Sequence, residues 1–548
     1  MERFKRCPAI VLTMICIVIA LHPCLSSENQ KPLTIAESSN FTETSKHADV
    51  IRFIEELQKQ TPLLRVEQLC TSTEGRQVPL LIIGNPAPAS PIDLNADDRM
   101  VVYIQANIHA GEVEGKEACL MLARDILLQQ NPPYLDKLVI LIAPIFNADG
   151  NDKLGKNRRD NGPELAGIRY NGQNLDLNRD AIKMESPELQ GMIQNVLNRW
   201  DPVLLVDCHT TNGSYHEEPV TYAWGFNPNG SNALVEHMRK SMMPSIQKNM
   251  EKKYNVLSIP YGNFMDAANP EKGWQTAGPE CRYITNYIGL RNRLSILNEN
   301  YAYADFKTRV WGCYYFLHTI LEYCSVKKED ILRLLKDADR KTIARGFQPA
   351  ETDSFHVEYD LQAYDERLTI RSWEMEVTQQ EGARPRVRRT DKKKTYSVPY
   401  FCKFVPKRSV KFPSGYFISV NDPSITDKLL QHGITVERLQ EPVTLEVESF
   451  QVKELKSDER LYQGHRVNAV KGEYAVEETS FPTGTLFVST AQRLGSLAAY
   501  LLEPESDDGL FVWNFFDRYL APQWGNRMQT APVYRLLEPV SLVKETIR

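Results

Sequence analysis

An alternation of apolar and amphipathic segments between residues 101 and 324 is the feature that most restricts the fold of this chain. Four segments are apolar along nearly their whole length and have the length of a β-strand: residues 100–107, 137–147, 201–209 and 293–301. Others repeat their apolar residues with a period of about 3.6, which predicts helices over residues 114–129, 186–200 and 309–324. Strands that are apolar on both sides belong to sheets buried on both faces. We therefore predict an α/β fold with a mixed, mostly parallel sheet covered by helices on both faces.

The sequence changes character after this region, which predicts a second part of the chain. A charged helical pattern predicts a linker over residues 328–353. From there on, alternating polar and apolar residues with many β-branched and aromatic side chains predict a β-rich accessory region over residues 354–548. The first domain then occupies residues 28–327.

Residues 1–26 are expected to be absent from the mature protein. Arg3, Lys5 and Arg6 precede an apolar run over residues 9–21, and small residues follow it. This pattern is typical of a secretory signal peptide, and the run is shorter than the roughly 20 residues that cross a bilayer. We expect a secreted or periplasmic protein without stable membrane insertion after signal cleavage. A retained membrane anchor is the alternative.

Charge and cysteine content argue against several other classes of protein. The net charge is −5 over 548 residues, so the chain as a whole has no bias toward nucleic acid or anionic membranes. A basic run at residues 384–394 lacks interleaved aromatic residues, and we interpret it as a solvated loop rather than a polyanion-binding site. The seven cysteines beyond the signal segment form no CxxC motif, which is typical of neither a zinc finger nor a disulfide scaffold. The sequence does not decide whether one or two disulfides form.

Two potential metal ligands, His109 and Glu112, lie where a predicted strand leads into a predicted helix. Such a pair alone is a weak signal, because a catalytic zinc site takes three protein ligands and leaves a position for water. His209 ends another apolar run, and ligands of open α/β sheets bind at the carboxyl ends of the strands. We therefore predict His209 as the third ligand. His216, in a predicted loop, is its rival.

Further candidates for chemistry lie at another strand end and in one polar segment. Glu299 closes a third apolar run, where a carboxylate base would face the same cleft. The segment 167–180 contains Arg169, Asn178 and Arg179 among other asparagines and aspartates. Guanidinium groups bind carboxylates in bidentate geometry, and asparagine amides add donors. The segment therefore predicts an anion clamp, with an ion-paired structural loop as the alternative.

These elements follow one another in a distinctive order: His109-x-x-Glu112, the arginine- and asparagine-rich segment, His209 at a strand end, and Glu299. In this order and spacing the chain resembles the zinc carboxypeptidase family, the M14 metallopeptidases. The later β-rich region resembles the C-terminal extension of some bacterial secreted members. The resemblance implies a zinc carboxypeptidase-like catalytic domain and one Zn²⁺ per chain, held by His109, Glu112 and His209.

The resemblance also implies roles for two groups that act on the scissile bond. Glu299 would be the general base, taking a proton from the activated water and passing it to the leaving amine. Arg169 would polarise the scissile carbonyl and stabilise the oxyanion. Arg158 and Arg159, in a basic stretch shortly before it, are the alternatives for this second role.

Recognition of the peptide terminus is likewise implied by the family. Asn178 and Arg179 would hold the terminal carboxylate. The family folds a mobile tyrosine over its substrate, and Tyr283 and Tyr287 precede Glu299. We select Tyr287 for this role.

The function that follows is a secreted zinc carboxypeptidase acting on peptides or proteins with a free C-terminal carboxylate, with no nucleic-acid partner. A zinc-dependent amidase or deacylase, or a cell-wall peptide hydrolase, would use the same site. A catalytically silent peptide-binding relative is the alternative from another class, although every residue that the chemistry needs is present. Adhesion through the basic run at residues 384–394 is a third hypothesis.

Overall fold

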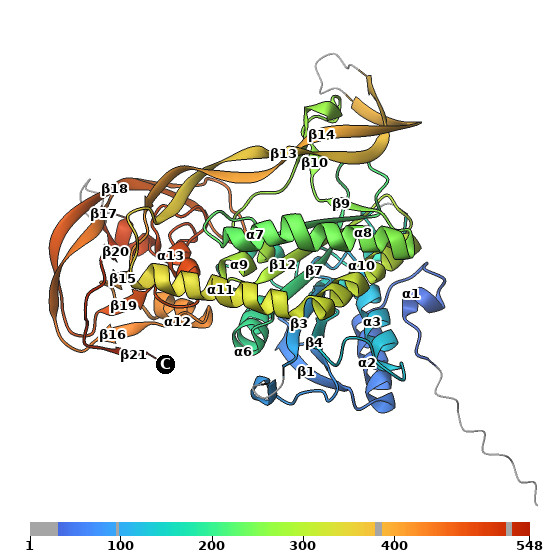
Figure 1. Cartoon of the computed structure of the whole chain (residues 1–548), viewed down its shortest axis with the longest axis horizontal. Helices are drawn as coiled ribbons and strands as arrows, with labels where there is room; N and C mark the ends of the chain where they lie inside the picture. The colour runs from blue at the N-terminus through green and yellow to red at the C-terminus, as the bar shows by residue number, and fades with distance from the viewer. Residues whose placement is uncertain (1–30, 95–97, 160, 379–385, 522–528, 548) are drawn as a thin grey trace, which may run out of the picture. The chain divides into compact units, whose positions relative to one another are not determined.

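The computed structural model describes residues 31–94, 98–159, 161–378, 386–521 and 529–547 (Figure 1). The expected signal peptide, residues 1–26, lies outside the described residues. Residues 32–548 group into one unit by their contacts. No helix of the described ranges is both long enough and apolar enough to cross a membrane.

An eight-stranded mixed sheet forms the core of the N-terminal half of the chain. Its strands lie in the order β1-β2-β4-β3-β7-β12-β8-β9, and the central four, β4, β3, β7 and β12, are parallel. All residues of β3 and β4 are buried, so both faces of the sheet are covered, and the α/β prediction is confirmed. The strands are β1 Leu64–Thr71, β2 Gln77–Ile83, β3 Met100–Ala106, β4 Leu138–Ala143, β7 Leu204–Thr211, β8 Val220–Trp224, β9 Ser258–Pro260 and β12 Leu294–Tyr301.

Helices pack around this sheet, and the predicted ones are confirmed. Helix α3 packs on β3, β7 and α10, while α9 packs on β7 and β12. Local signals set their ends: Asp305 accepts a hydrogen bond from the Thr308 amide at the start of α10. The helices are α1 Ile35–Ser38, α2 His47–Gln60, α3 Glu114–Leu127, α4 Ala148–Asp152, α5 Pro187–Gly191, α6 Asn198–Trp200, α7 Asn232–His237, α8 Met243–Tyr254, α9 Ile284–Leu290, α10 Phe306–Val326 and α11 Lys328–Phe347.

A second sheet dominates the C-terminal region, drawn from yellow to red in Figure 1. Its seven strands lie in the order β18-β17-β20-β15-β19-β16-β21, and its neighbours pair antiparallel. This confirms a β-rich region with a few helices. The elements are β15 Gly415–Ile418, α12 Pro423–Gln431, β16 Glu437–Leu439, β17 Val443–Ser457, β18 Asn468–Phe481, β19 Leu486–Ser489, α13 Gly495–Leu502, α14 Asp517–Leu520, β20 Thr530–Leu536 and β21 Lys544–Thr546.

A long antiparallel hairpin connects the two halves of the chain. Its strands are β13 Ser354–Thr378 and β14 Arg386–Lys411. Strand β14 also pairs with β11 Trp274–Gln275, which pairs with β10 Asn263–Phe264, so both halves contribute to one four-stranded sheet. The basic run at residues 384–394 therefore does not form a loop from residue 386 onward. Its side chains are mostly exposed, and Lys392 forms an ion pair with Glu374. A strand can therefore carry this run of positive charges, because the charges stay in solvent or pair with acidic side chains.

The cysteines beyond the signal segment are free thiols. Six of the seven are buried, and Cys70 is half-buried. Burial raises the pKa of the Cys324 thiol to about 12, so this thiol stays protonated at neutral pH. Among the described residues, no two cysteines form a disulfide.

Candidate metal centre and active site

Three predicted ligands converge at the carboxyl edge of the central strands. His109 follows β3, Glu112 precedes α3, and His209 lies near the end of β7. One ligand atom from each lies within 4.8 Å of the others, and all three side chains are buried. His109 Nδ1 is 3.1 Å from Glu112 Oε1, and His209 Nδ1 is 3.1 Å from Glu112 Oε2.

The local sequence explains why these side chains meet. Asn107 adopts a positive φ of 66°, which turns the chain sharply after β3, and its side-chain amide donates to the Ala110 carbonyl (3.2 Å). In the first turn of α3, a Cβ at Gly115 would lie 2.5 Å from Cys208 Cβ. Glycine therefore allows α3 to approach β7 closely enough to bring Glu112 beside His209.

Two aspartates orient the histidines from outside the cluster. His109 Nε2 is 2.9 Å from Asp176 Oδ1, and His209 Nε2 is 2.8 Å from Asp207 Oδ2. When Nε2–H donates to a carboxylate, the lone pair of Nδ1 is directed toward the centre of the cluster, which is how metal-binding histidines are held. Two imidazole nitrogens and one carboxylate form the donor set of a catalytic zinc site, so these residues fit zinc.

The charges in the cluster are strongly coupled. Burial opposes the ionisation of Glu112, but the neighbouring His109, His209 and Arg159 hold its pKa well below the usual range. Burial likewise disfavours a charged His209, yet Asp207 and Glu112 raise its pKa well above the usual value. Asp207 and Glu112 therefore favour positive charge at His209, and the same carboxylates would favour a cation bound there.

Glu299 lies directly beside this cluster. It pairs in register with His209 on the parallel neighbour β7 and with Thr221 on β8. Its Oε2 is buried and has no hydrogen-bond partner among the described residues. Burial raises the pKa of Glu299 to about 7, and the negative charge of Glu112 acts in the same direction, against the opposing effect of His209. A carboxyl with this pKa can accept and release a proton near neutral pH.

Two arginines approach the cluster from the 155–170 segment. Arg159 Nη2 is 2.5 Å from Glu112 Oε1, and its Nη1 donates to Asn212 Oδ1 (2.8 Å). Arg169 is bound to Asp176 (2.8 Å) and is 3.6 Å from Glu112. The alternative Arg159 therefore lies closer to the ligands than the preferred Arg169 does.

The predicted carboxylate clamp borders a small cavity of about 30 Å³. Asn178 lines it, and its Oδ1 accepts the Ile284 amide (3.2 Å). The guanidinium of Arg179 lies 4.5 Å from the ring centroid of Tyr283, which also lines the cavity. Among the described residues of its lining, Asp207 is the one carboxylate, and that carboxylate is already bonded to His209.

Tyr287 is not at the site, contrary to the sequence prediction. It is fully buried within α9, and its hydroxyl is 2.8 Å from His432 Nδ1 in the C-terminal region. The segment before Glu299 folds into a helix rather than a loop, so Tyr287 cannot cover a substrate. Tyr283, just before this helix, is the tyrosine that the structure brings beside Arg179.

His216, the rival ligand, lies outside the cluster. Its ring is buried 4.0 Å from the ring of Tyr301, and burial lowers its pKa to about 3. It is a neutral side chain packed among aromatic rings.

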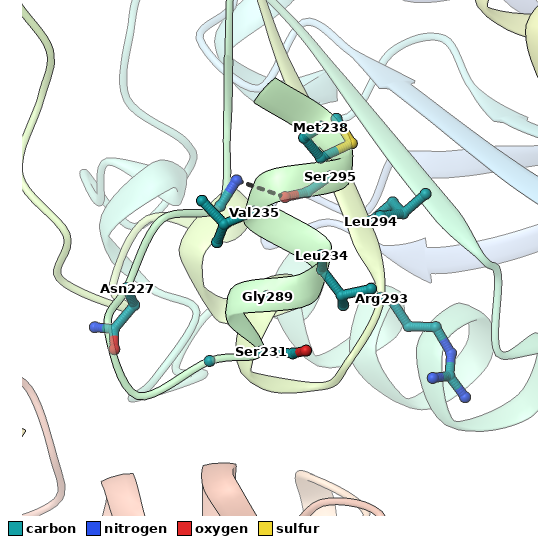
Figure 2. A pocket seen from close by; sticks show the side chains of 11 residues that line it. Asn227, Ser231, Leu234, Val235, Met238, Gly289, Arg293, Leu294 and Ser295 are labelled. Atoms are coloured by element: carbon teal, nitrogen blue, oxygen red, sulfur yellow. Dashed lines mark hydrogen bonds between the residues drawn. The ribbon is translucent and has the colours of Figure 1, made fainter. Parts of the chain in front are cut away.

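The cluster opens into a cavity of about 490 Å³. The cavity is lined on one side by His109 and Glu112 and on the other by the 155–159 and 166–170 segments. A third cavity, shown in Figure 2, lies at the opposite end of β12, next to Leu294. Its polar wall includes the Ser295 hydroxyl, which accepts the Gly225 amide. At about 10 Å³ it holds no more than one water and is not a ligand site.

Sequence reasoning missed three residues of the site. Asp176 and Asp207 were visible as carboxylates near predicted ligands, but nothing in the sequence shows which histidine each one orients. Tyr261 follows β9, lines the cavity beside Asn178, and is close enough to Glu299 and Glu112 to be affected by their charges. Its signal, a tyrosine followed by glycine after a short strand, is common in proteins without such a site.

This fold and donor set are compatible with a metal-dependent hydrolase, and comparison with known proteins indicates which class. Residues 50–283 match the zinc carboxypeptidase family. The match covers less than half of the chain, so it shows a region similar to zinc carboxypeptidases, and this similarity supports a peptide hydrolase. The family resemblance stated from the sequence is confirmed.

Relatives extend the similarity into the C-terminal region. Carboxypeptidase 2 of Trichophyton equinum is 23% identical over 455 residues, which cover 80% of this chain and 77% of that protein. Probable carboxypeptidase 2 of Arthroderma benhamiae is 23% identical over 459 residues, covering 80% of each. Among solved structures, the metallo-carboxypeptidase from Burkholderia cenocepacia is 17% identical with a TM-score of 0.38, over 52% of this chain and 69% of that one.

Proposed function

We propose that this protein is a secreted metallocarboxypeptidase that releases residues from the C-terminus of peptides, as the names of its relatives suggest for them. One observation carries the proposal: His109, Glu112 and His209 form a three-ligand cluster with Glu299 on the adjacent strand. The relationship to zinc carboxypeptidases supports the metal, and the N-terminal sequence supports secretion.

Zinc held by His109, Glu112 and His209 would supply Lewis-acid chemistry and lower the pKa of water near it to about 7. Glu299 is proposed to accept the proton of the attacking water and then to donate it to the leaving amine. Its position next to His209 and its raised pKa fit both halves of this transfer.

The cationic groups are proposed to divide two tasks. Arg159, beside Glu112 on the wall of the larger cavity, stabilises the negative charge that develops on the scissile carbonyl oxygen. Arg169 lies next to it and supports the same charge at a longer distance. Asn178 and Arg179, at the smaller cavity, bind the terminal carboxylate, and Tyr283 flanks them.

Matched peptides that differ only at the C-terminus test the proposal. The purified protein, loaded with one equivalent of zinc, is incubated with a peptide ending in a free acid and with its C-terminal amide. We expect release of the last residue from the free acid and at least about a 100-fold slower reaction with the amide, because the amide cannot pair with the clamp. Equal cleavage of both would instead favour the amidase or endopeptidase alternative. Absence of zinc binding would refute the metallopeptidase site.

A further inference from the structure

A tight turn of the C-terminal region reaches the metal centre. Tyr462 and His465 pair through both backbone hydrogen bonds, Tyr462 N to His465 O (2.7 Å) and His465 N to Tyr462 O (3.0 Å). Gln463 and Gly464 between them have φ values of 53° and 82°. Two successive residues with positive φ are the signature of a type I′ turn, a connection with a well-defined geometry. This turn places Gln463 at its tip, from where the side chain reaches Asp176.

Contacts on both sides fix this turn against the catalytic domain. His465 Nε2 is 2.7 Å from Glu185 Oε1, and its Nδ1 is 3.0 Å from Asn514 Oδ1 within its own region. The ring of Tyr462 lies 5.4 Å from the guanidinium of Arg282. The turn is thus held by a charged pair on one side and a cation–π contact on the other.

Gln463, at the tip of the turn, contacts the residue that orients His109. Its Oε1 accepts the backbone amide of Asp176 at 2.8 Å, across 287 residues of sequence. The Asp176 carboxylate in turn contacts His109 Nε2 (2.9 Å) and Arg169 Nε (2.8 Å). It also accepts a hydrogen bond from the backbone N–H of Asn178 (3.1 Å). Asp176 therefore connects a metal ligand with the predicted carboxylate clamp, and Gln463 restrains its backbone.

We propose that the Tyr462–His465 turn is part of the active site and that Gln463 is a positioning residue for the metal centre. This inference rests on the proposed function, because it assumes that His109 binds zinc. Gln463 holds the Asp176 peptide in place, Asp176 holds the His109 ring, and His109 Nδ1 is thereby directed at the cluster. The C-terminal region then contributes directly to the affinity for zinc, in addition to covering the catalytic domain.

Two substitutions of Gln463 separate the hydrogen bond from the volume of the side chain. Gln463→Met keeps the volume but loses the carbonyl acceptor. Gln463→Glu keeps an acceptor oxygen at the same reach. Arg460→Ala, at an exposed position just before the turn, is the control for an unrelated change in this segment. Zinc dissociation constants of the full chain are measured by competition with a chelating dye, and thermal unfolding of the metal-free forms reports on folding.

Substitution of a residue that hydrogen-bonds directly to a metal ligand changes metal affinity by about 10- to 100-fold. Gln463 is one hydrogen bond further from the metal, because it contacts Asp176 and not His109 itself. We therefore expect Gln463→Met to weaken zinc binding by about three- to tenfold. Gln463→Glu and Arg460→Ala should stay within about twofold of the parent chain, and saturating zinc should restore the kcat of Gln463→Met.

Unchanged zinc affinity in Gln463→Met would overturn the inference. Equal losses in Gln463→Met and Gln463→Glu would overturn it as well, since the acceptor would not be responsible. If Gln463→Met unfolds at the same temperature as the parent chain and still loses affinity, the loss is local to the metal centre and supports the inference. A parent chain that binds no zinc would overturn the proposed function and this inference together, whereas a zinc-binding parent with an unaffected variant overturns only the inference.

Discussion

Replacement of Asp207 by asparagine probes the outer support of the metal centre. Asp207 is fully buried, and its Oδ2 lies 2.8 Å from His209 Nε2. Asparagine has the same shape, and its carbonyl oxygen can still accept the Nε2–H. The substitution therefore removes the negative charge while it retains the hydrogen bond, and it makes His209 a weaker electron donor toward a metal.

The size of the effect follows from two independent considerations. Substitution of the outer carboxylate of a metal-binding histidine weakens metal binding by about 10- to 100-fold, or about 1.4–2.8 kcal/mol. A hydrogen bond to a charged group contributes about 1.5–3 kcal/mol, and the neutral bond that remains contributes about 1 kcal/mol. The difference is about 0.5–2 kcal/mol, so the two ranges overlap near a tenfold to 30-fold loss of zinc affinity.

The assay is zinc titration of the metal-free protein at constant pH, with thermal unfolding of the same samples. Glu188→Gln is the matched control, because Glu188 is also a fully buried carboxyl, bonded to Asn171, away from the cluster. We expect this control to bind zinc within about twofold of the parent chain. Zinc affinity of Asp207→Asn within twofold of the parent would refute the role of Asp207 in orienting and polarising His209.

Three further outcomes are expected. Glu299→Gln should lower kcat by about 10²- to 10⁴-fold while the protein still binds zinc, because Glu299 lies beside the ligand cluster but outside it. Steady-state kinetics and metal analysis check this prediction, and loss of zinc would contradict it. Peptides ending in a small uncharged residue such as Ala should lose that residue at least about tenfold faster than peptides ending in Lys or Arg, since the cavity of about 30 Å³ beside Asn178 offers a cation no free carboxylate among its described residues. Competition in one peptide mixture measures the ratio, and a preference for basic ends would refute the assignment of the cavity. The third outcome concerns the ion pair between His465 and Glu185. The Glu185 carboxylate raises the pKa of His465, so the stabilisation from the protonated His465 is present below the unfolded pKa of about 6.5. It is lost as pH rises through the folded pKa. His465 and Lys183 together lower the pKa of Glu185 to about 2, so the stabilisation from the charged Glu185 is present above an unfolded pKa of about 4.3 and is lost as pH falls toward 2. His465→Gln should therefore lower Tm most at about pH 5–6 and least near pH 9; an equal decrease at every pH would argue against the ion pair.

The central fold could be predicted because its signals are local and strong. Fully apolar strands such as β3 and β4 and regularly amphipathic helices such as α3 carry their own periodicity. The helical segments over residues 232–254 were missed. Pro244 interrupts their pattern, and residues 238–242 form a π-helical turn that shifts the periodicity.

The convergence of the three predicted ligands could be predicted for a different reason. His109, Glu112 and His209 follow buried strands, and the geometry of a parallel sheet brings such strand ends together. Tyr287 could not be placed this way. Its environment depends on His432, 145 residues later, and sequence spacing gives no information about a partner in another region. The same holds for Gln463, whose contact with Asp176 depends on how two sheets pack.

The contacts between the halves of the chain also set the order in which the parts of the site can come together during synthesis. Arg282 binds Asp508 226 residues later, and Asp176 meets Gln463 only after nearly 300 further residues have been synthesised. Contacts this distant in sequence form late and slow the folding of a chain. During synthesis the catalytic half therefore leaves the ribosome without its last structural partners. If Gln463 supports the metal centre as proposed, we expect a chain that lacks the C-terminal sheet to bind zinc more weakly than the full chain.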